Sequence, residues 1–360
     1  MPFNTTNEVT IMSMKDTIER IKGLDERAMS TAKKRQDNLT KPRRSLGNLE
    51  DLSIKIAGIT GNPMPKLKDK VIITMAGDHG VTEEEVSVFP KEVTAQMIYN
   101  FLSGGAGINV LARHVGARVV VVDMGVAVDI QNERLVTKKI AYGTANMTKG
   151  PAMTYEDAMR SIEAGIEVLE LEAEKGMDIV GVGDMGIGNT TPSSAIAAVI
   201  TGESVREVTG RGTGINDEML ERKIKVVEEA IRVNKPNKKD PIDVLAKVGG
   251  FEIGGMAGVM LAAAAHRIPI VIDGFISGAA ALIAYELAPT AKVYMIAAHR
   301  SVERGHAVIL ESLDLKPLLD LNMRLGEGTG AALGISIVDA ACKILTEMAT
   351  FEEAGVAEQR

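Results

Sequence analysis

Residues 70–80 read KVIITMAGDHG and residues 179–191 read IVGVGDMGIGNTT. In both stretches a short apolar run ends abruptly in glycines and a carboxylate. Unbroken runs rich in valine and isoleucine are typical of strands that are buried on both faces, as in parallel sheets. The glycines and polar residues that follow mark the turn at which each strand ends.

The same pattern recurs along the chain and predicts an α/β fold. We expect strands at residues 71–76, 119–122, 179–182, 268–272 and 293–297. Helical periodicity lies between them, at residues 92–114, 155–174, 192–200, 217–233, 256–266 and 278–287. Alternating strands and helices predict a parallel sheet with right-handed crossovers.

The ends of the chain differ from this middle. Residues 13–60 have apolar side chains at helical spacing, and Asn62-Pro63 is a turn signal. We therefore divide the chain into a helical segment (1–62), a parallel α/β domain (63–320) and a glycine-rich loop with a C-terminal helix (321–360). The basic stretch around Lys33, Lys34 and Arg35 admits a nucleic-acid surface, but a solvated helix face is favoured.

Composition excludes several classes of protein. The net charge of −7 and the absence of tryptophan oppose binding to nucleic acid, which needs a basic face and favours aromatic platforms. The single cysteine, Cys342, cannot form an internal disulfide and lies in an apolar run. The first residues lack the pattern of an export signal, and the apolar stretch 253–265 is shorter than a membrane span. We expect a cytoplasmic protein with no membrane contact.

Small and polar residues follow each expected strand. They are Gly77-Asp78-His79-Gly80, Asp123-Met124-Gly125, Gly183-Asp184-Met185-Gly186, Asp273-Gly274-Phe275 and His299-Arg300-Ser301. Ligands of open parallel sheets bind outside the carboxyl ends of the strands, so this edge is the predicted site. The alternative is that aspartate and glycine are here only as turn residues.

The segment from Gly181 to Gly186 matches GxGxxG, which would suggest a dinucleotide. The match is weak because its first glycine lies inside the apolar run and the helix begins late. A helix capped by Thr190 or Thr191, with Pro192 at its first position, would instead offer free N–H groups to a phosphate. A capped helix without any ligand remains the alternative.

Two further glycine-rich segments stand out. Gly210-Arg-Gly212-Thr-Gly214 precedes a helix that carries Lys223, and this combination suits a phosphate. Gly326-Glu327-Gly328 places one carboxylate between glycines. If this loop closes over the edge of the sheet, burial raises the pKa of Glu327 and makes it a candidate base near neutrality. An exposed acidic loop is the alternative.

No metal site is expected. The candidate ligands Asp78, His79, Asp123, Asp184, Asp273 and His299 come from separate strand ends and lack compact metal-ligand spacing. A hydrolase of the GxSxG type is likewise excluded, because the sequence lacks that motif.

Five strings, AGDHGV, SVFPKEVTAQM, GVGDMGIGNTTPSSA, GRGTG and RLGEGTGAA, occur in this order over most of the chain. They resemble the nicotinate-nucleotide:dimethylbenzimidazole phosphoribosyltransferase (CobT) family. The resemblance implies a Rossmann-like parallel sheet, a smaller helical domain from both terminal segments, and a homodimer. It also implies transfer of phosphoribose from nicotinate mononucleotide to 5,6-dimethylbenzimidazole in cobalamin synthesis, with no metal or redox cofactor.

The resemblance also implies roles for individual residues. Glu327 would be the general base. The benzimidazole pocket would include Ser87, Gln96 and Leu325, and the phosphate would contact Gly212, Lys223, Gly274 and Ser301. Beside these we add, from the residues themselves, Phe89 as the nearest aromatic side chain for the acceptor pocket. The turn and helix start at Gly186, Gly188, Asn189 and Thr190 are added for the phosphoribosyl group. Asp184 stands where the family pattern has glutamate, so its supporting role is open.

Three alternatives to this function remain. A transferase acting on other azole or phenolic acceptors would share most of these motifs. A nucleotide-binding regulator without enzymatic activity would not need Glu327, and an NAD(P) dehydrogenase would bind a nicotinamide cofactor.

Overall fold

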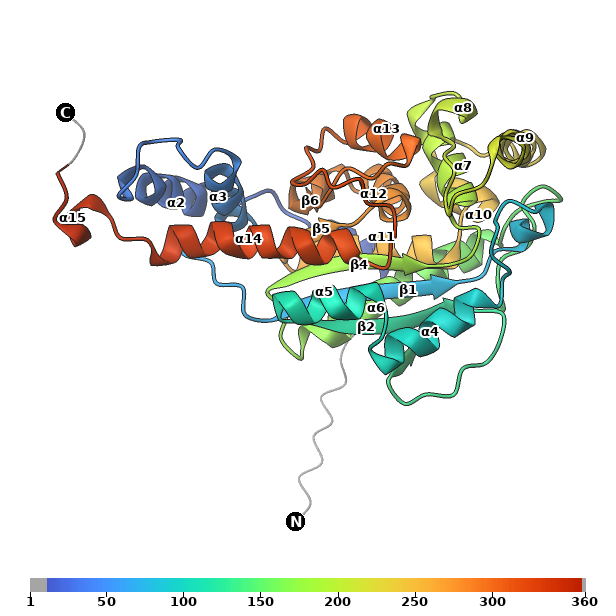
Figure 1. Cartoon of the computed structure of the whole chain (residues 1–360), viewed down its shortest axis with the longest axis horizontal. Coiled ribbons are helices and arrows are strands. Elements are labelled where there is room, and N and C mark those ends of the chain that lie inside the picture. Colours follow the sequence, from blue (N-terminus) through green and yellow to red (C-terminus); the bar gives the residue numbers. More distant parts are fainter. Residues whose placement is uncertain (1–11, 358–360) are drawn as a thin grey trace, which may run out of the picture.

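The computed structural model describes residues 12–357 and contains one six-stranded parallel sheet (Figure 1). The strand order is β3-β2-β1-β4-β5-β6. The strands are β1 (Lys70–Gly77), β2 (Ala117–Gly125), β3 (Leu135–Thr137), β4 (Ile179–Met185), β5 (Ile270–Ile272) and β6 (Met295–Ala297). The predicted parallel α/β fold is confirmed, and the order reverses between β1 and β4.

Helices follow most strands. Their bounds are α1 Met14–Arg20, α2 Glu26–Asn38, α3 Asn48–Thr60, α4 Val93–Ser103, α5 Gly107–Val115, α6 Tyr155–Ala173, α7 Thr190–Thr201, α8 Val205–Val208, α9 Asp217–Asn234, α10 Pro241–Val248, α11 Phe251–Ala265, α12 Phe275–Leu287, α13 Arg304–Ser312, α14 Thr329–Glu347 and α15 Phe351–Ala354. Two 3₁₀ helices, η1 (Gly80–Glu84) and η2 (Pro289–Tyr294), complete the set.

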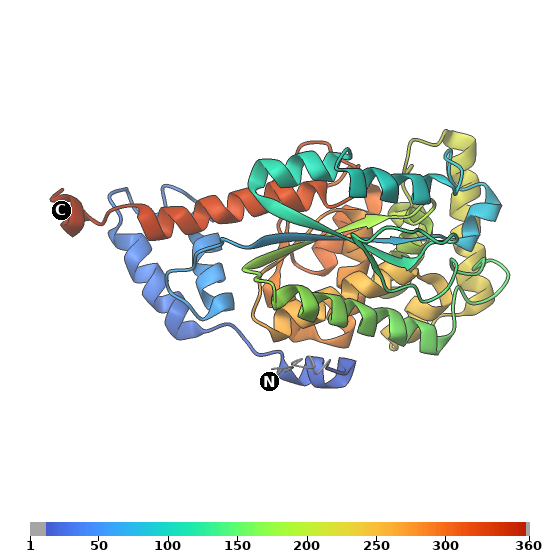
Figure 2. The ribbon, with the colours of Figure 1, turned by 90° about the horizontal axis from the view of Figure 1, so that it is seen from below.

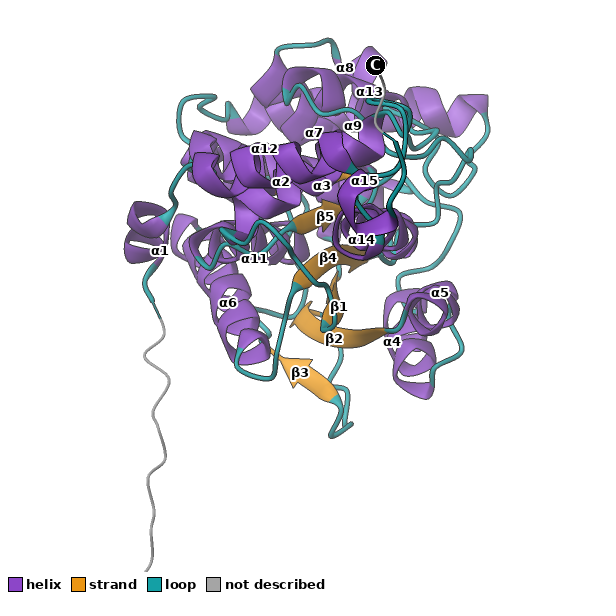
Figure 3. Cartoon of the chain, turned by 90° about the vertical axis from the view of Figure 1, so that its left-hand side faces the viewer, coloured by secondary structure: helices purple, strands orange, loops and turns teal. Residues whose placement is uncertain are grey.

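These helices cover both faces of the sheet. Figure 3 shows α4, α5 and α14 on one side of the strands and α11 on the other, with α6 packed against α11. Because both faces are covered, the strands are mostly apolar, and every residue of β1 after Lys70 is buried.

One expected helix, at residues 92–114, is wrong as a single element. The chain forms α4 and α5, separated at Gly104 and Gly105. Gly104 has φ +80°, a left-handed conformation that ends α4, and the N–H of Gly105 donates to the carbonyl of Asn100 at 3.1 Å. This break frees the N-terminus of α5, which then faces the site described below.

Other differences concern short elements. The strands expected at 268–272 and 293–297 begin two residues later, and η2 occupies most of the residues before β6. We did not predict β3, α8, α10, α13 or α15. Each is short, from three to nine residues, so its periodicity is too brief to read.

The terminal segments lie together at one end of the molecule. Figures 1 and 2 show α2 and α3 beside the C-terminal half of α14, beyond the amino ends of the strands. Arg35 of α2 donates to the carbonyls of Leu345 and Met348 at 2.9 and 3.2 Å. That part of the basic stretch therefore holds the C-terminus of α14. By contrast, α1 packs against α6 and α11.

The helix α14 is the one described helix that is long and apolar enough to cross a membrane by length and composition. It runs along the sheet, where it packs against α3, α5 and β4, and 61% of its apolar window is buried within the protein. The apolar side chains of α14 are thus largely packed in the core of the protein.

Candidate active site

The loop Gly326-Glu327-Gly328 lies against the carboxyl ends of β1 and β4. The N–H of Glu327 donates to the carbonyl of Asp184 at 3.2 Å, and Thr74 Oγ1 donates to the carbonyl of Glu327 at 2.9 Å. Two neighbouring strands, both distant from the loop in sequence, therefore fix the backbone of Glu327.

Glycines make this close approach possible. All three loop residues have positive φ, at +82°, +63° and +94°, which is strained for a residue with a side chain such as Glu327. A Cβ atom on Gly183 would overlap the backbone of Glu327. The glycine in β4 is therefore required for the loop to pack on the strand.

The carboxylate of Glu327 is buried, with 6% of the residue exposed, so the loop is not the exposed acidic turn of the alternative interpretation. Its Oε2 accepts a hydrogen bond from the N–H of Ile108 at 3.0 Å. Ile108 lies in the first turn of α5, where free N–H groups stabilise negative charge. Burial raises the pKa of Glu327 despite this hydrogen bond. A buried carboxylate with a raised pKa is suited to accept a proton.

Asp273, at the end of β5, holds the other side of the loop. Its two carboxylate oxygens accept hydrogen bonds from the N–H groups of Gly328 and Ala331 at 3.1 and 3.0 Å. Burial, together with the nearby charge of Asp184, raises the pKa of Asp273 to about 8. Asp273 thus joins the sheet to the start of α14.

Asp184 is the penultimate residue of β4 and lies beside the Glu327 loop. Its Oδ2 accepts a hydrogen bond from Asn189 Nδ2 at 2.9 Å, and burial raises its pKa to about 7, with the charges of Glu252 and Glu327 adding to the shift. Our expectation that Thr190 or Thr191 caps α7 is wrong: Asn189 occupies that position. Its side chain is engaged with Asp184 and makes no capping bond.

A second group of the predicted residues meets around Lys223, the buried lysine of α9. Its Nζ donates to Thr190 Oγ1 at 2.7 Å and to the carbonyl of Gly210 at 3.4 Å. Gly212 adjoins the same ammonium group, with φ +52°. Burial lowers the pKa of Lys223 to about 8. The N-terminus of α7, a lysine and a glycine-rich turn are thereby brought together, as an anion site requires.

Ser301 and Gly274 lie at the ends of the next two strands and are also buried. The N–H of Ser301 donates to Nδ1 of His306 at 3.0 Å, and the Ser301 hydroxyl oxygen accepts from the N–H of Glu303 at 3.3 Å. None of the described hydrogen bonds is donated by the Ser301 hydroxyl. Burial lowers the pKa of His306 to about 3, so the ring is neutral and its other nitrogen carries the proton.

The residues predicted for the benzimidazole pocket are more exposed. Phe89 and Leu325 are 49% and 61% exposed. Leu325 adjoins Gly107, next to Glu327 Oε2. Ser87 Oγ accepts from the N–H of Phe89 at 3.2 Å, and Gln96 is exposed on α4. None of the described hydrogen bonds joins Ser87 or Gln96 to Glu327.

One pair near the site was missed. His79 Nε2 and Glu252 Oε1 form a fully buried hydrogen bond of 2.7 Å. Burial lowers the pKa of His79, but the adjacent Glu252 together with the charges of Asp78 and Asp184 outweighs burial, so the net shift is upward. Glu252 lies in the first turn of α11, just before the apolar stretch 253–265. In the sequence, only the position of this single carboxylate directly before an apolar run could have indicated that Glu252 is buried.

The GxGxxG match has a packing explanation. A Cβ atom on Gly181 would lie 2.7 Å from Ile72 and 3.0 Å from Ala331, so this glycine lets α14 approach the sheet. Gly181 therefore lies inside β4, where it packs against α14, and not in the turn where a pyrophosphate would bind.

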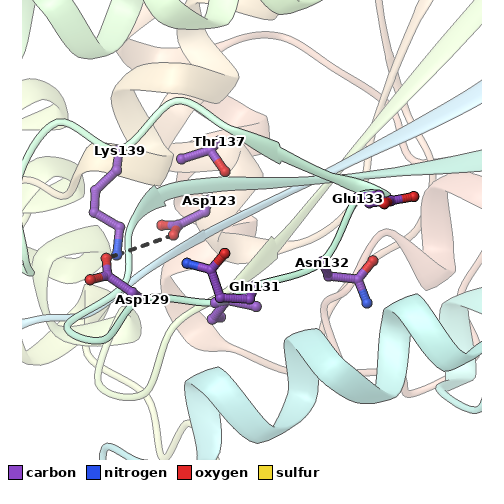
Figure 4. A pocket seen from close by; sticks show the side chains of 8 residues that line it. Asp123, Asp129, Gln131, Asn132, Glu133, Thr137 and Lys139 are labelled. Atoms are coloured by element: carbon purple, nitrogen blue, oxygen red, sulfur yellow. Dashed lines mark ion pairs between the residues drawn. The ribbon is translucent and has the colours of Figure 1, made fainter.

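Asp123, another residue predicted at the sheet edge, stabilises the turn that follows it. Its Oδ1 accepts from the N–H groups of Gly125 and Val126, and Lys139 forms an ion pair with it at 3.3 Å (Figure 4). These side chains line a polar cavity of about 490 Å³ beyond β2 and β3, which does not include Glu327 or Lys223. Within residues 12–357, no group of three or more His, Cys, Asp or Glu side chains could hold a metal ion.

Comparison with known proteins adds the decisive observation. A family model described as Phosphoribosyltransferase matches residues 21–356, almost the whole chain. The chain belongs to this family. The resemblance inferred from the five sequence motifs is confirmed.

Two similar relatives of this phosphoribosyltransferase have the same name. A protein of Chloroflexus aggregans is 61% identical over 345 residues, which cover 96% of this chain and 98% of the relative. A protein of Desulforudis audaxviator is 61% identical over 348 residues, covering 96% and 99%. Both are named nicotinate-nucleotide–dimethylbenzimidazole phosphoribosyltransferase.

Solved structures agree. The crystal structure of the enzyme of that name from Thermus thermophilus matches with a TM-score of 0.88 at 42% identity, over 93% of this chain and 100% of the other. A second Thermus thermophilus structure, described as CobT, has a TM-score of 0.89 at 42% identity, over 92% of this chain and 100% of the other.

Proposed function

We propose that this phosphoribosyltransferase transfers the 5-phosphoribosyl group of nicotinate mononucleotide to 5,6-dimethylbenzimidazole in cobalamin synthesis. The products are α-ribazole 5′-phosphate and nicotinate. The observation that carries the proposal is the buried Glu327 carboxylate on a glycine-rich loop, in a chain whose relatives are named for this reaction.

The chemistry fits the side chains. Nicotinate mononucleotide carries a cationic pyridinium at C1′, which is already a good leaving group. The protein must therefore hold one nitrogen of the benzimidazole behind C1′ and remove the proton from the other nitrogen. In our proposal Glu327 takes this proton, and attack from the opposite face inverts C1′.

Asp184 has a supporting role in this proposal. Positive charge develops on the ribose as nicotinate leaves, and a buried carboxylate stabilises such charge strongly. The cationic substrate favours the ionised form of Asp184, although burial raises its pKa to about 7 in the free protein. The aspartate keeps the charge of the family's glutamate and has a shorter reach.

The phosphate of the donor would occupy the cluster around Lys223. Thr190, Gly212, Gly274 and Ser301 are the proposed partners, with Gly186, Gly188 and Asn189 near the ribose. Phe89 and Leu325, with Ser87 and Gln96, would enclose the flat acceptor and exclude water, which would otherwise hydrolyse the nucleotide. Azole or phenolic acceptors other than dimethylbenzimidazole remain a second candidate for this pocket.

The direct test is chromatography of nicotinate mononucleotide incubated with the protein, with and without dimethylbenzimidazole. We expect nicotinate and α-ribazole 5′-phosphate only when the acceptor is present. Parallel reactions with phenol and p-cresol rank the acceptors. Binding without release of nicotinate under any condition would indicate a nucleotide-binding regulator and contradict the proposal.

We also propose that the chain acts as a cytoplasmic homodimer. Size-exclusion chromatography with light scattering tests the assembly, since the monomer has a mass of 38.3 kDa. A species of twice this mass is expected, and a monomer at micromolar concentration would contradict it.

A further inference from the structure

Glu303 is a buried carboxylate beside the proposed phosphate cluster that the mechanism above does not use. It lies at the N-cap of α13, and 6% of the residue is exposed. Its Oε2 atom is buried and receives no hydrogen bond, and no ion pair within residues 12–357 includes Glu303. A buried carboxylate oxygen without a donor is costly, so its partner is expected to come from a ligand.

The position of Glu303 ties it to the same cluster. A Cβ atom on Gly210 would overlap Oε2 of Glu303, and the carbonyl of Gly210 accepts from Lys223 Nζ. The N–H of Glu303 donates to Ser301 Oγ at 3.3 Å. Gly210 thus lies between a buried ammonium and a buried carboxylate, and only a glycine fits between them.

This arrangement is unusual for a phosphate site. A carboxylate repels a phosphate dianion, and one lysine against one glutamate leaves the two buried side chains with no net charge. A phosphate with one protonated oxygen resolves the conflict, because its O–H can donate to the carboxylate while its other oxygens accept from Lys223 and Thr190. Hydrogen bonds between O–H and a carboxylate are short and strong.

We propose that Glu303 accepts a hydrogen bond from a protonated phosphate oxygen, so that the cluster around Lys223 selects a protonated phosphate over anions without a proton. This inference rests on the proposed function, which puts the donor's phosphate in this cluster. It adds Glu303 as a residue that determines specificity at the same subsite.

The test uses two probes of similar size, inorganic phosphate and sulfate. Near neutrality phosphate retains an O–H group, whereas sulfate has none. We expect phosphate to compete with nicotinate mononucleotide, and to bind the full-length protein in calorimetry, at least about tenfold more tightly than sulfate, as a site built for a donor group rejects a ligand that lacks it. Equal binding of the two anions by the wild type would overturn the inference.

The variant Glu303→Gln provides the second arm. Its amide can donate to a fully ionised oxygen, so sulfate should gain affinity until the two anions differ by less than about twofold. Glu311→Gln, an exposed position on the same helix, is the matched control and should keep the wild-type preference. An unchanged preference in Glu303→Gln, with thermal unfolding like that of the control, would overturn the inference.

A different result is expected if the cluster around Lys223 does not bind the phosphate at all. In that case neither anion would compete with the nucleotide, and Lys223→Ala would leave the KM of the donor unchanged. If both anions compete but with equal strength, the phosphate cluster stands and the role of Glu303 alone falls.

Discussion

The N–H of Ile108 donates a hydrogen bond of 3.0 Å to Oε2 of Glu327, across 219 residues of sequence. This contact joins the first turn of α5 to the glycine-rich loop before α14. The helix N-terminus favours the ionised carboxylate, while burial raises the pKa of Glu327. The carboxylate is therefore more basic than that of an exposed glutamate, as suits a group that accepts a proton.

The loop position depends on Gly183. In Gly183→Ala the added methyl group would overlap the backbone of Glu327 and displace it. We expect kcat to fall by about a hundredfold or more, because small displacements of a catalytic group are costly. Gly23→Ala is the control, since its Cβ would meet nothing within 4 Å. Steady-state kinetics with saturating substrates make the comparison, and near-normal kcat in Gly183→Ala would contradict the role of this glycine.

Lys223→Ala should raise the KM for nicotinate mononucleotide by about tenfold or more, because it removes a buried charge from the proposed phosphate site. The KM for dimethylbenzimidazole should change little. Lys225→Ala on the exposed face of α9 is the matched control. If both lysine variants have the same donor KM as the wild type, Lys223 does not contact the phosphate.

Phe89→Ala should raise the KM for dimethylbenzimidazole several-fold, about the cost of losing one aromatic contact. The donor KM should remain at the wild-type value. Val128→Ala removes a similarly exposed apolar side chain away from the predicted pocket and serves as the control. Equal acceptor KM values in the two variants would remove Phe89 from the pocket.

The raised pKa of Asp184 predicts how stability changes with pH. In the unfolded chain this carboxyl loses its proton near its ordinary pKa of 3.8, whereas in the folded protein it keeps the proton until about pH 7. The folded state binds more protons in this window. The contribution to stability is therefore complete below pH 3.8 and is lost as the pH rises through about 7.

Asp184→Asn should weaken this dependence. Between about pH 4 and 7 the free energy of unfolding of the wild type should fall more steeply, by up to about 1.4 kcal/mol per pH unit, than that of the variant. Urea unfolding at pH 5 and pH 7 measures the difference, with the exposed Asp314→Asn as control. Identical slopes in Asp184→Asn and the wild type would show that Asp184 is ionised normally in the folded protein.

The sequence was sufficient to predict the parallel sheet, because runs such as 71–76 and 179–182 are almost entirely apolar and are followed by glycine and aspartate. It also indicated Glu327 and Lys223, since each lies in or just after a glycine-rich segment. The contacts that define the site could not be read in the same way. The bond from Ile108 to Glu327 depends on the break at Gly104 and Gly105, which helical periodicity alone did not reveal.

Other residues were missed or misassigned because their roles depend on contacts that the sequence does not show. Glu252 and Glu303 are single carboxylates without a motif. Only the packing shows that Glu252 is buried against His79 and Glu303 against Gly210, both from distant segments. Asp123 was grouped with the site because it follows a strand. Its oxygens satisfy the turn at Gly125 and Val126, a local use that sequence position cannot distinguish from ligand binding.

The most direct test of the central claim is the turnover of Glu327→Gln. The glutamine can still accept the hydrogen bond from Ile108, so the variant should fold and bind nicotinate mononucleotide normally. Without a base, its kcat for α-ribazole 5′-phosphate should fall by about 10² to 10⁴, while the exposed control Glu347→Gln keeps full activity. A kcat for Glu327→Gln within a few-fold of the wild type would contradict the assignment of Glu327 as the general base.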